Sequence, residues 1–545
     1  MNFYYFLRQP IESVFFLLFL FLNLISNGAC LSYYNDAKHL FFVVVLSFLY
    51  AYIESALYKL LFYRWLKRIY IFFICLLLNI FIITDFFLIF NFHIPFYEDI
   101  ADIVLETNAR EMVNFFESYL SISSLIGYLS SLFFFNILIW YISKRLSSYF
   151  LPSLTSLSFF LVLIGLSVFF YMGYSFVFYR NGMSIPQLAS ITRFYHTINV
   201  VRDRIVMIHR LQVVCDSTEA TCGDPTKPTV AVIIGESHSL YHSSLYGYPL
   251  DTNPLLHKRF LKGNLFLFDN VVTIDDHTHG AIKSVFSLDS LNLNFDKVPL
   301  FPQIFKAAGY YTVMFDNQYM VGKGISFLSD KKLSDSMFDK RNNTIYNYDG
   351  DLVDEIEVKE EPSLYVIHLW GQHYTYKNRY PEEYNIFSSK DYDGRDNNLS
   401  QKTVIAQYDN ACLYNDYVID QILSKFENKN AIVFYLSDHG EEIYEQRDFI
   451  GHGDAVYSPD LRYQIRVPFL IFVSDSFKLT HEDLCHQFKA SQHTPIITDD
   501  ISHVILNSAS IQSLYFSPER CFTNPNYKEK KPRMVLHSID YNQFQ

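Results

Sequence analysis

The chain has 545 residues, half of them hydrophobic, and a formal net charge of -12 at neutral pH. This acidic balance argues against nucleic acid as a partner. Its 7 cysteines show no Cys-x-x-Cys spacing, so neither a zinc finger nor a thioredoxin-like site is indicated. The length allows several domains, and the first third of the chain is far more apolar than the rest.

The apolar first third contains hydrophobic stretches of roughly the 20 residues that cross a bilayer. There are five of them, at residues 14–30, 40–62, 69–90, 122–142 and 154–178. The first has a long apolar core, and we interpret it as an uncleaved anchor rather than a signal peptide. The sequence therefore predicts a multi-pass membrane domain over residues 1–178.

The charges between these stretches predict the orientation of the membrane domain. Lys and Arg residues concentrate in the loop after the second stretch and in the loop after the fourth, which places both loops in the cytoplasm. Five spans then put the chain after about Tyr179 outside the cytoplasm. We expect a bridging segment at residues 179–227 and an extracytoplasmic catalytic domain at residues 228–545.

The acidic loop at about residues 91–121 faces outward in this arrangement. Its helical apolar spacing predicts an amphipathic helix at the membrane surface. Within it, Asn108 and Glu111 are candidates for contact with a lipid headgroup, in particular with an ammonium group. The alternative is a solvated polar face, and from the pattern alone this alternative is favoured.

The last three fifths of the chain alternate between strand-like and helix-like segments. Apolar runs rich in β-branched and aromatic residues are typical of strands that are buried on both faces of a parallel sheet. They lie at residues 229–234, 310–315, 364–370, 431–436 and 467–473, with longer amphipathic stretches between them. This alternation predicts an α/β domain with a mostly parallel central sheet.

Four of these runs end in polar residues that can bind a metal or a phosphate. The endings are Gly235-Glu236-Ser237-His238, Asp316-Asn317-Gln318, Gly371-Gln372-His373 and Ser437-Asp438-His439-Gly440. Ligands in open α/β sheets bind beyond the carboxyl ends of the strands. Glu236, Asp438 and His439 offer two carboxylates and an imidazole, which together with one hydroxyl oxygen complete a four-coordinate zinc site.

Two hydroxyl groups compete for the fourth position and for the role of nucleophile. Ser237 follows Glu236 directly, but adjacent side chains on an extended backbone point to opposite faces. Thr278 lies in Asp275-Asp276-His277-Thr278-His279-Gly280 and would cap a helix that begins near Gly280, where backbone N–H groups face a phosphate. We favour Thr278.

Several other residues are candidates for contact with the reacting group. His373 and His452 have glycine neighbours and could hold a second metal or stabilise a transferring phosphoryl group. For each of them alone, a surface histidine is the more common case. Lys323 could pair with a phosphate or could be a solvated loop residue, and His368 is predicted to be buried and structural.

An extracytoplasmic location permits disulfide bonds. Cys215 and Cys222 are the favoured pair because they are close in sequence. Cys412 lies in the helix predicted at residues 401–426, and we expect it to be a buried thiol.

Taken together, these motifs resemble those of the membrane-bound phosphoethanolamine transferases. The resemblance rests on Gly235-Glu236-Ser237, Ser244-Leu245-Tyr246-Gly247-Tyr248, Asp251-Thr252-Asn253-Pro254, Asp316-Asn317, His368-Leu369-Trp370-Gly371-Gln372-His373, Arg379-Tyr380-Pro381, Tyr408-Asp409-Asn410 and Ser437-Asp438-His439-Gly440-Glu441. With the five-segment anchor, it covers essentially the whole chain. The family has an alkaline phosphatase- or sulfatase-like catalytic domain and modifies lipopolysaccharide on lipid A or on core sugars.

The resemblance also implies roles for individual residues. The implied zinc ligands are Glu236, Thr278, Asp438 and His439, with Thr278 also the nucleophile that carries phosphoethanolamine from phosphatidylethanolamine to the acceptor. His373 and His452 would contact the phosphoethanolamine group, and Asn108 and Lys323 are carried over as substrate-binding residues. One zinc ion is expected, and a second is an open alternative.

Departures from the family pattern bear on the acceptor. Other functions remain as alternatives. No cysteine lies near Thr278, which resembles the branch that modifies core sugars more than the lipid A branch. The alternatives are a related phosphoglycerol transferase or sulfatase-type hydrolase, and a non-enzymatic membrane sensor. We expect a monomer in the bacterial inner membrane, and an added ethanolamine cation would offset lipopolysaccharide charge and favour polymyxin resistance.

Overall fold

A computed structural model describes residues 10–11, 14–32, 37–92, 95–96, 112, 126–127, 130–146, 167, 190–319, 321, 326–453, 455, 458–530 and 532–544. The chain forms two compact units, Met1–Arg204 and Ile205–Gln545. Each unit is described by itself below.

The first unit contains long apolar helices. They are α2 (Val14–Gly28), which continues into a short 3-10 turn at Ala29–Ser32, α3 (Ala37–Leu60) and α4 (Arg64–Phe92). Among the described residues, three helical segments are long and apolar enough to cross a membrane, namely Val14–Leu31, His39–Leu60 and Arg64–Asn91. They coincide with the first three predicted stretches.

The other predicted membrane stretches are only partly described. Residues 130–146 are helical and belong to the fourth stretch. The fifth stretch lies outside the described residues except for residue 167, and the loop at residues 91–121 is described only at residues 91–92, 95–96 and 112. The predicted number of five spans is therefore not confirmed, and Asn108 lies outside the described residues.

The second unit is built on a mixed sheet, which has seven strands among the described residues. Their order is β3 (Leu265–Phe268), β11 (Phe469–Val473), β8 (Ala431–Ser437), β2 (Thr229–Gly235), β7 (Ser363–His368), β5 (Tyr311–Asp316) and β6 (Lys340–Arg341). The pairings from β8 to β6 are parallel, as predicted. Strand β11 runs antiparallel to both β8 and β3, which the prediction of a mostly parallel sheet did not include.

Alternate side chains of the central strand β2 enter two different hydrophobic cores. Val230, Val232 and Ile234 pack in one core, and Ala231 and Ile233 pack in the other. This period of two explains why the strand is apolar throughout, because both of its faces are buried.

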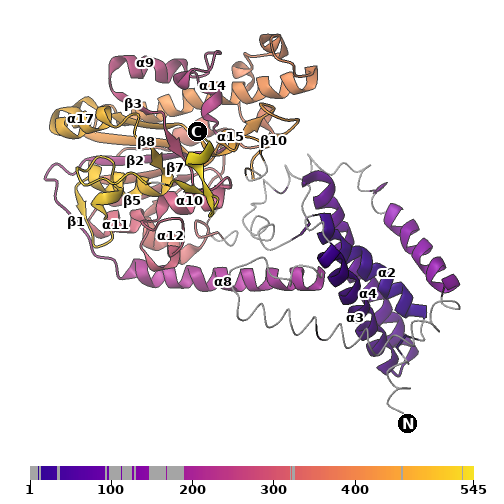
Figure 1. The fold of residues 1–545 in the computed structure, drawn as a ribbon. Helices are drawn as coiled ribbons and strands as arrows, with labels where there is room; N and C mark the ends of the chain where they lie inside the picture. Colours follow the sequence, from indigo (N-terminus) through magenta and orange to yellow (C-terminus); the bar gives the residue numbers. More distant parts are fainter. Residues whose placement is uncertain are drawn as a thin grey trace. The chain divides into compact units, whose positions relative to one another are not determined.

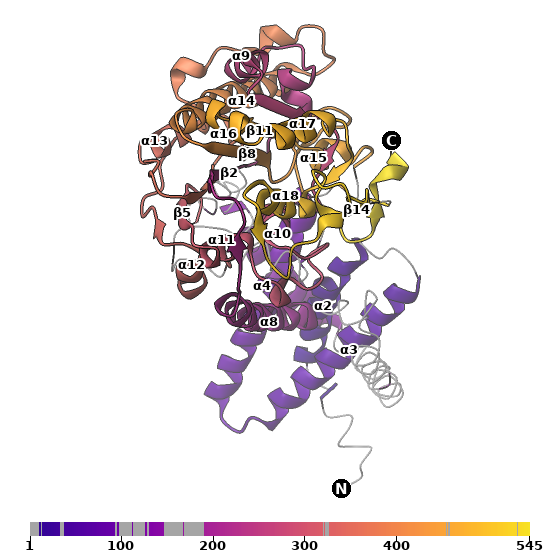
Figure 2. The same ribbon diagram turned by 90° about the vertical axis from the view of Figure 1, so that its left-hand side faces the viewer.

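Helices cover both faces of the sheet and give three layers (Figures 1 and 2). On one side lie α9 (Pro254–Lys262), α13 (Asp349–Val353) and α14 (Leu399–Phe426). On the other side lie α10 (Thr278–Phe286), α11 (Phe301–Ala307), α12 (Lys331–Met337), α18 (Ile501–Ser508) and the C-terminal part of α8 (Ser190–Asp216). Helix α8 lies within the segment predicted to bridge the two domains.

Shorter elements complete the second unit. Helices α15 (Arg462–Ile465), α16 (Asp475–Thr480) and α17 (Glu482–Ala490) flank β11 along the chain. Two-stranded pairings join β1 (Thr221–Cys222) to β13 (Ile511–Gln512), β9 (Glu442–Ile443) to β10 (Ile450–Gly451), β4 (Val271–Val272) to β12 (Ile496–Ile497), and β14 (Met534–Val535) to β15 (Ile539–Asp540).

The cysteines correct one prediction and confirm another. All 7 cysteine thiols are free, so the predicted disulfide between Cys215 and Cys222 does not form in this structure. Cys215 packs in the hydrophobic core beside β2, whereas Cys222 lies in the edge pairing β1–β13. Cys412 is fully buried in α14, as predicted.

Candidate metal centre and active site

The register of the parallel strands brings the candidate ligands to one edge of the sheet. Gly235, the last residue of β2, pairs with Ser437, the last residue of β8. Glu236 and Asp438 therefore follow neighbouring strands at the same level, and the Asp438 amide donates to the Gly235 carbonyl at 3.0 Å. The prediction that these strand ends converge is confirmed.

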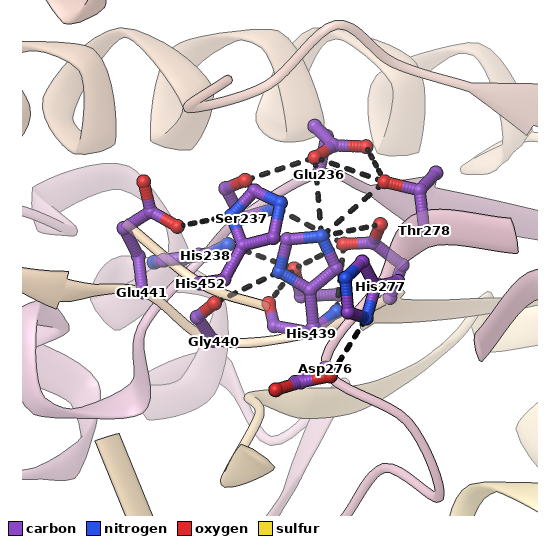
Figure 3. Close-up of polar contacts among 12 residues, drawn as sticks. Glu236, Ser237, His238, Asp276, His277, Thr278, His439, Gly440, Glu441 and His452 are labelled. Atoms are coloured by element: carbon purple, nitrogen blue, oxygen red, sulfur yellow. Dashed lines mark hydrogen bonds and ion pairs between the residues drawn. The ribbon is translucent and has the colours of Figure 1, made fainter. Parts of the chain in front are cut away.

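Thr278 comes from a different element and completes the cluster. Its Oγ1 lies 3.3 Å from Glu236 Oε2 and 3.3 Å from His439 Nε2, while His439 Nε2 lies 3.2 Å from Asp438 Oδ2. Figure 3 shows the side chains of Glu236, Thr278 and His439 pointing toward one another. The structure thus brings together all four residues that were expected to bind zinc.

Helix α10 begins two residues earlier than the sequence suggested. Thr278 is its first residue, and His277, with extended backbone angles (φ -124°, ψ 141°), takes the N-cap position. The prediction that Thr278 takes the N-cap position of a helix starting near Gly280 was wrong, because Thr278 is itself the first helical residue. The threonine still lies at the helix N-terminus, where backbone N–H groups without intrahelical partners favour negative charge.

The side chain of Ser237 also lies beside Glu236, although it was expected to point to the opposite face. Its backbone is left-handed (φ 56°) and not extended, so the argument that its side chain must point away from that of Glu236 does not apply. The Ser237 hydroxyl donates to Glu236 Oε1 at 2.8 Å. Ser237 is fully buried, whereas Thr278 is half-buried, so the threonine hydroxyl is the more accessible of the two.

The buried carboxylates and the imidazole of this cluster shift one another's pKa values. Burial raises the pKa of Asp438 to about 7, and the charge of Glu236 adds to the shift. Burial lowers the pKa of His439, but the facing carboxylates of Asp438 and Glu236 raise it to about 10. Burial also raises the pKa of Glu236, yet the hydrogen bond and charge of His439 hold it well below its usual range. Two carboxylates thus compete for one imidazolium, an arrangement that attracts a cation.

The donor set fits a zinc ion. Asp438 Oδ2 is buried and has no hydrogen-bond partner among the described residues, and single ligand atoms of Glu236, Asp438 and His439 lie within 4.8 Å of one another. His439 Nδ1 lies 2.8 Å from the Gly440 carbonyl oxygen and donates to it, so Nε2 faces the cluster and becomes a lone-pair donor when a metal displaces its proton. Carboxylate, imidazole and hydroxyl ligands with such a second contact are typical of zinc centres.

His452 lies beside the cluster and is fixed by a buried glutamate. Its Nδ1 is 2.6 Å from Glu441 Oε2, and the other oxygen of Glu441 accepts a hydrogen bond from the Tyr376 hydroxyl. The rings of His452 and His439 have centroids 3.9 Å apart. These contacts hold the His452 imidazole beside His439 (Figure 3).

His373 lies on the loop after β7. Its ring stacks on Trp370 with centroids 4.8 Å apart. Burial lowers the pKa of His373 to about 4, and Arg379 and His452 contribute while the charge of Glu236 opposes. Gly371 (φ 48°) lets this loop approach, because a Cβ atom there would lie 2.7 Å from the Glu236 carbonyl oxygen.

The remaining candidates fall into two groups. His368 is buried, as predicted, and its Nδ1 lies 3.1 Å from Asp316 Oδ1. Lys323, like Asn108, lies outside the described residues.

The structure adds contacts that the sequence did not assign. Gln318 Nε2 donates to Glu236 Oε2 at 3.1 Å, and Asp276 holds His277 Nδ1 at 2.8 Å beside the threonine. Glu441 orients His452 as described above. Gln318 and Glu441 both lie in polar segments that follow buried strands, and this position was the available signal.

Comparisons with known proteins show which family and which folds the chain resembles. A family model described as Sulfatase matches residues 228–511, which is more than half of the chain. Phosphoethanolamine transferase EptC of Escherichia coli (strain K12) is 30% identical over 318 residues, covering 55% of this chain and 54% of that protein. The chain thus spans about half the length of the curated relatives it matches.

Two solved structures are similar to the chain. The C-terminal periplasmic domain of EcEptC from Escherichia coli in complex with Zn superposes with a TM-score of 0.54 and 26% identity, over 60% of this chain and 96% of that domain. Lipooligosaccharide phosphoethanolamine transferase A (EptA) from Neisseria meningitidis, an integral membrane protein, gives a TM-score of 0.62 at 19% identity, over 93% of this chain and 97% of that one. The second likeness indicates a shared fold.

Proposed function

The chain belongs to the sulfatase family, and we propose that it is a membrane-bound transferase that moves phosphoethanolamine from phosphatidylethanolamine to lipopolysaccharide. One observation carries the proposal. The half-buried hydroxyl of Thr278 lies 3.3 Å from both Glu236 and His439, at a centre whose donor set fits zinc. The matched relative in Escherichia coli is named a phosphoethanolamine transferase.

In the first step, Thr278 Oγ1 attacks the phosphorus of the donor lipid. The bond from Oγ1 to phosphorus forms, the bond from phosphorus to the diacylglycerol oxygen breaks, and diacylglycerol leaves with a proton in place of the one that Thr278 loses. In the second step, an acceptor oxygen attacks the same phosphorus and the threonine hydroxyl is restored. The group is thus carried on the enzyme between two lipid substrates.

Glu236, Asp438, His439 and Thr278 would hold the zinc ion. When bound, zinc lowers the pKa of a coordinated hydroxyl and offsets negative charge on phosphoryl oxygens. The protein's own contribution is to fix Thr278 at a helix N-terminus and to exclude water behind it, because Glu236, Asp438 and His439 are buried.

His373 and His452 are proposed to contact the phosphoethanolamine group. Each ring is held in place, His373 by stacking on Trp370 and His452 by Glu441, and His452 lies against His439. Fixed donors near the phosphorus stabilise negative charge on its oxygens without reorganisation during the reaction.

The proposed location is the bacterial inner membrane, with the catalytic unit in the periplasm. Three described helices are long and apolar enough to span a membrane, and the similar Escherichia coli structure is a periplasmic domain. A membrane anchor suits the reaction because the donor and the acceptor are both lipids. We propose that the enzyme acts as a monomer, that its acceptor is a core sugar rather than lipid A, and that the modified surface resists polymyxin.

Mass spectrometry of lipopolysaccharide tests the proposal. Lipid A and core oligosaccharide would be analysed separately from cells that express the chain, its Thr278→Ala variant or the control variant Thr403→Ala, whose side chain is exposed on α14. We expect a phosphoethanolamine increment on the core fraction with the wild-type and control chains and none with Thr278→Ala.

The other outcomes separate the alternatives. An increment on lipid A alone would contradict the core acceptor but keep the reaction, and an increment that survives in Thr278→Ala would exclude Thr278 as nucleophile. Phosphoglycerol on a glycan, or release of inorganic sulfate from a sulfate ester, would replace the proposal with one of the two related activities. No modification of any substrate would favour a sensor.

A further inference from the structure

A pocket of about 780 Å³ opens in the catalytic unit away from the candidate ligands, none of which lines it. Its walls come from the segment after β2, from the end of α9, from β3 and from the residues that precede β11. Figure 1 labels α9 and β3 on the same part of the unit. The volume lies within the range of small-molecule sites, which is about 300–1,000 Å³.

The lining of the pocket combines aromatic rings with hydrogen-bonding groups. Tyr241, Tyr248 and Phe260 contribute rings, and Phe260 is 37% exposed although it is large and apolar. Asp269 and His493 both line the pocket, with His493 Nδ1 2.7 Å from Asp269 Oδ2 and side chains 49% and 85% exposed, respectively. Rings that present a flat apolar face, next to charged and amide groups, suit a sugar, because a sugar has C–H faces and a rim of hydroxyl groups.

The charge of Arg466 indicates the kind of sugar. Its guanidinium donates to the Tyr241 hydroxyl at 3.3 Å and to the Asp269 backbone carbonyl, both neutral acceptors. Within the described part of the chain, no carboxylate lies at ion-pair distance from Arg466. A half-buried cation without an anionic partner favours an anionic ligand.

The pocket is connected to the metal centre through one short segment. Tyr241 packs against Tyr463 with ring centroids 4.8 Å apart, and Arg466 follows α15 directly. On its other side, this segment holds the catalytic loop, because the Gly440 amide donates to the Gln464 carbonyl at 2.7 Å. Residues 462–466 thus contribute Arg466 to the pocket and contact Gly440, the neighbour of His439, through Gln464.

We propose that this pocket binds an anionic sugar unit of the acceptor glycan and thereby holds the acceptor near Thr278. The inference rests on the proposed function, since it assigns the site where the acceptor of that reaction is recognised. The anion is a phosphate or a carboxylate on the sugar, because both are matched by the guanidinium of Arg466.

Binding and turnover of the full-length protein in detergent test the inference. The probe is core oligosaccharide released from lipopolysaccharide, used as isolated and after enzymatic dephosphorylation. We expect Phe260→Ala and Arg466→Gln each to weaken binding at least tenfold, and Leu261→Ala to leave it unchanged. Leu261 is the matched control, because it neighbours Phe260 on α9, is 72% exposed and does not line the pocket.

Dephosphorylation distinguishes the two anions. Affinity that falls on dephosphorylation identifies a phosphate, and affinity that is retained by the wild type but lost in Arg466→Gln identifies a carboxylate. In transfer assays, we expect Phe260→Ala to raise the KM for the acceptor at least tenfold. Labelling of Thr278 with phosphoethanolamine in the absence of acceptor is expected to stay as in the wild type, and this separates acceptor recognition from misfolding.

Two results would overturn the inference. In the first, Phe260→Ala and Arg466→Gln bind the oligosaccharide as the wild type does. In the second, both variants lose the labelling of Thr278 as much as they lose transfer. Failure of the proposed function itself looks different, because the wild type would then transfer no phosphoethanolamine to any acceptor. Oligosaccharide binding at the pocket remains measurable in that case.

Discussion

The hydroxyl groups of Thr278 and Ser237 both lie against Glu236, and they differ in exposure. Ser237 is fully buried and adopts a left-handed backbone, whereas Thr278 is half-buried at the start of a helix. Sequence reasoning preferred Thr278 because Ser237 was expected to be extended, and that premise fails at Ser237. The preference for Thr278 now rests on access from solvent and on its contact with His439.

Zinc binding can be measured without turnover. We expect zinc at 100 times its Kd to stabilise the folded protein by about 2.7 kcal/mol, because it binds the native cluster and not the unfolded chain. Chelation should reverse the shift in the thermal unfolding temperature, and Glu236→Gln should bind less zinc by elemental analysis and show a smaller shift. An equal shift in Glu236→Gln and in the control Glu383→Gln, whose side chain is on the surface, would contradict the assignment.

The raised pKa of His242 predicts that the folded protein loses stability in alkaline solution. Burial lowers its pKa, but Asp409 at 2.5 Å and Glu445 at 2.8 Å raise it to about 9. A raised pKa stabilises the folded state fully below the unfolded value of about 6.5. That contribution, of the order of 3 kcal/mol, is lost as the pH rises through about 9.

The test compares thermal unfolding of the wild type with that of His242→Gln between pH 6 and about pH 10. The difference in stability between the two proteins should shrink as the pH rises. Groups elsewhere in the chain that titrate in this range are present in both proteins and cancel in the comparison. A difference that stays constant with pH would mean that His242 is not held in its charged form.

At the scale of elements, the sequence predicted which strand ends meet but not the direction of every strand. The apolar runs that end in Glu236, Asp438 and His373 were recognisable because strands buried on both faces lack polar alternation. The direction of β11 cannot be predicted from its apolar run Phe469–Val473, since a strand buried on both faces has the same apolar pattern whether it is parallel or antiparallel to its neighbours. The start of α10 was misplaced because His277 caps the helix with its backbone alone and makes no side-chain cap bond.

The first unit holds a buried ion pair between two helices. Asp85 of α4 and Arg193 of α8 are in contact at 2.5 Å, with side chains 0% and 1% exposed. Arg193 also donates to the Ser190 hydroxyl, and the Ser190 amide donates to Asn27 at the end of α2. These bonds hold the start of α8 against the helices that are candidates to span the membrane.

Breaking this pair should be costly. We expect Arg193→Met to lower the free energy of unfolding by about 3–5 kcal/mol, because it leaves the buried Asp85 carboxylate without its countercharge. The double variant Asp85→Leu with Arg193→Met should recover part of the loss. Thermal unfolding in detergent measures both, with Arg202→Ala as control, because Arg202 lies on the same helix in an exposed pair with Asp203. Equal stability of Arg193→Met and Arg202→Ala would contradict the expectation.

At the scale of the whole molecule, composition alone separated an apolar first part from a catalytic second part. The structure divides the chain at Arg204, within α8, and the sequence placed the bridging segment at residues 179–227. The absence of the predicted Cys215–Cys222 disulfide and the contacts made by Gln318 and Glu441 depend on distances between side chains in space. A single sequence does not provide such distances, whereas strand ends follow from local pattern.

The central claim is that Thr278 carries the phosphoethanolamine group between donor and acceptor. The most direct measurement incubates the full-length protein with ethanolamine-labelled phosphatidylethanolamine in the absence of acceptor, then digests it and locates the label by mass spectrometry. We predict a phosphoethanolamine increment on the peptide that contains Thr278, which disappears on addition of acceptor and is absent in Thr278→Ala. Label on Ser237, or transfer to acceptor with no labelled residue at any time, would contradict the account.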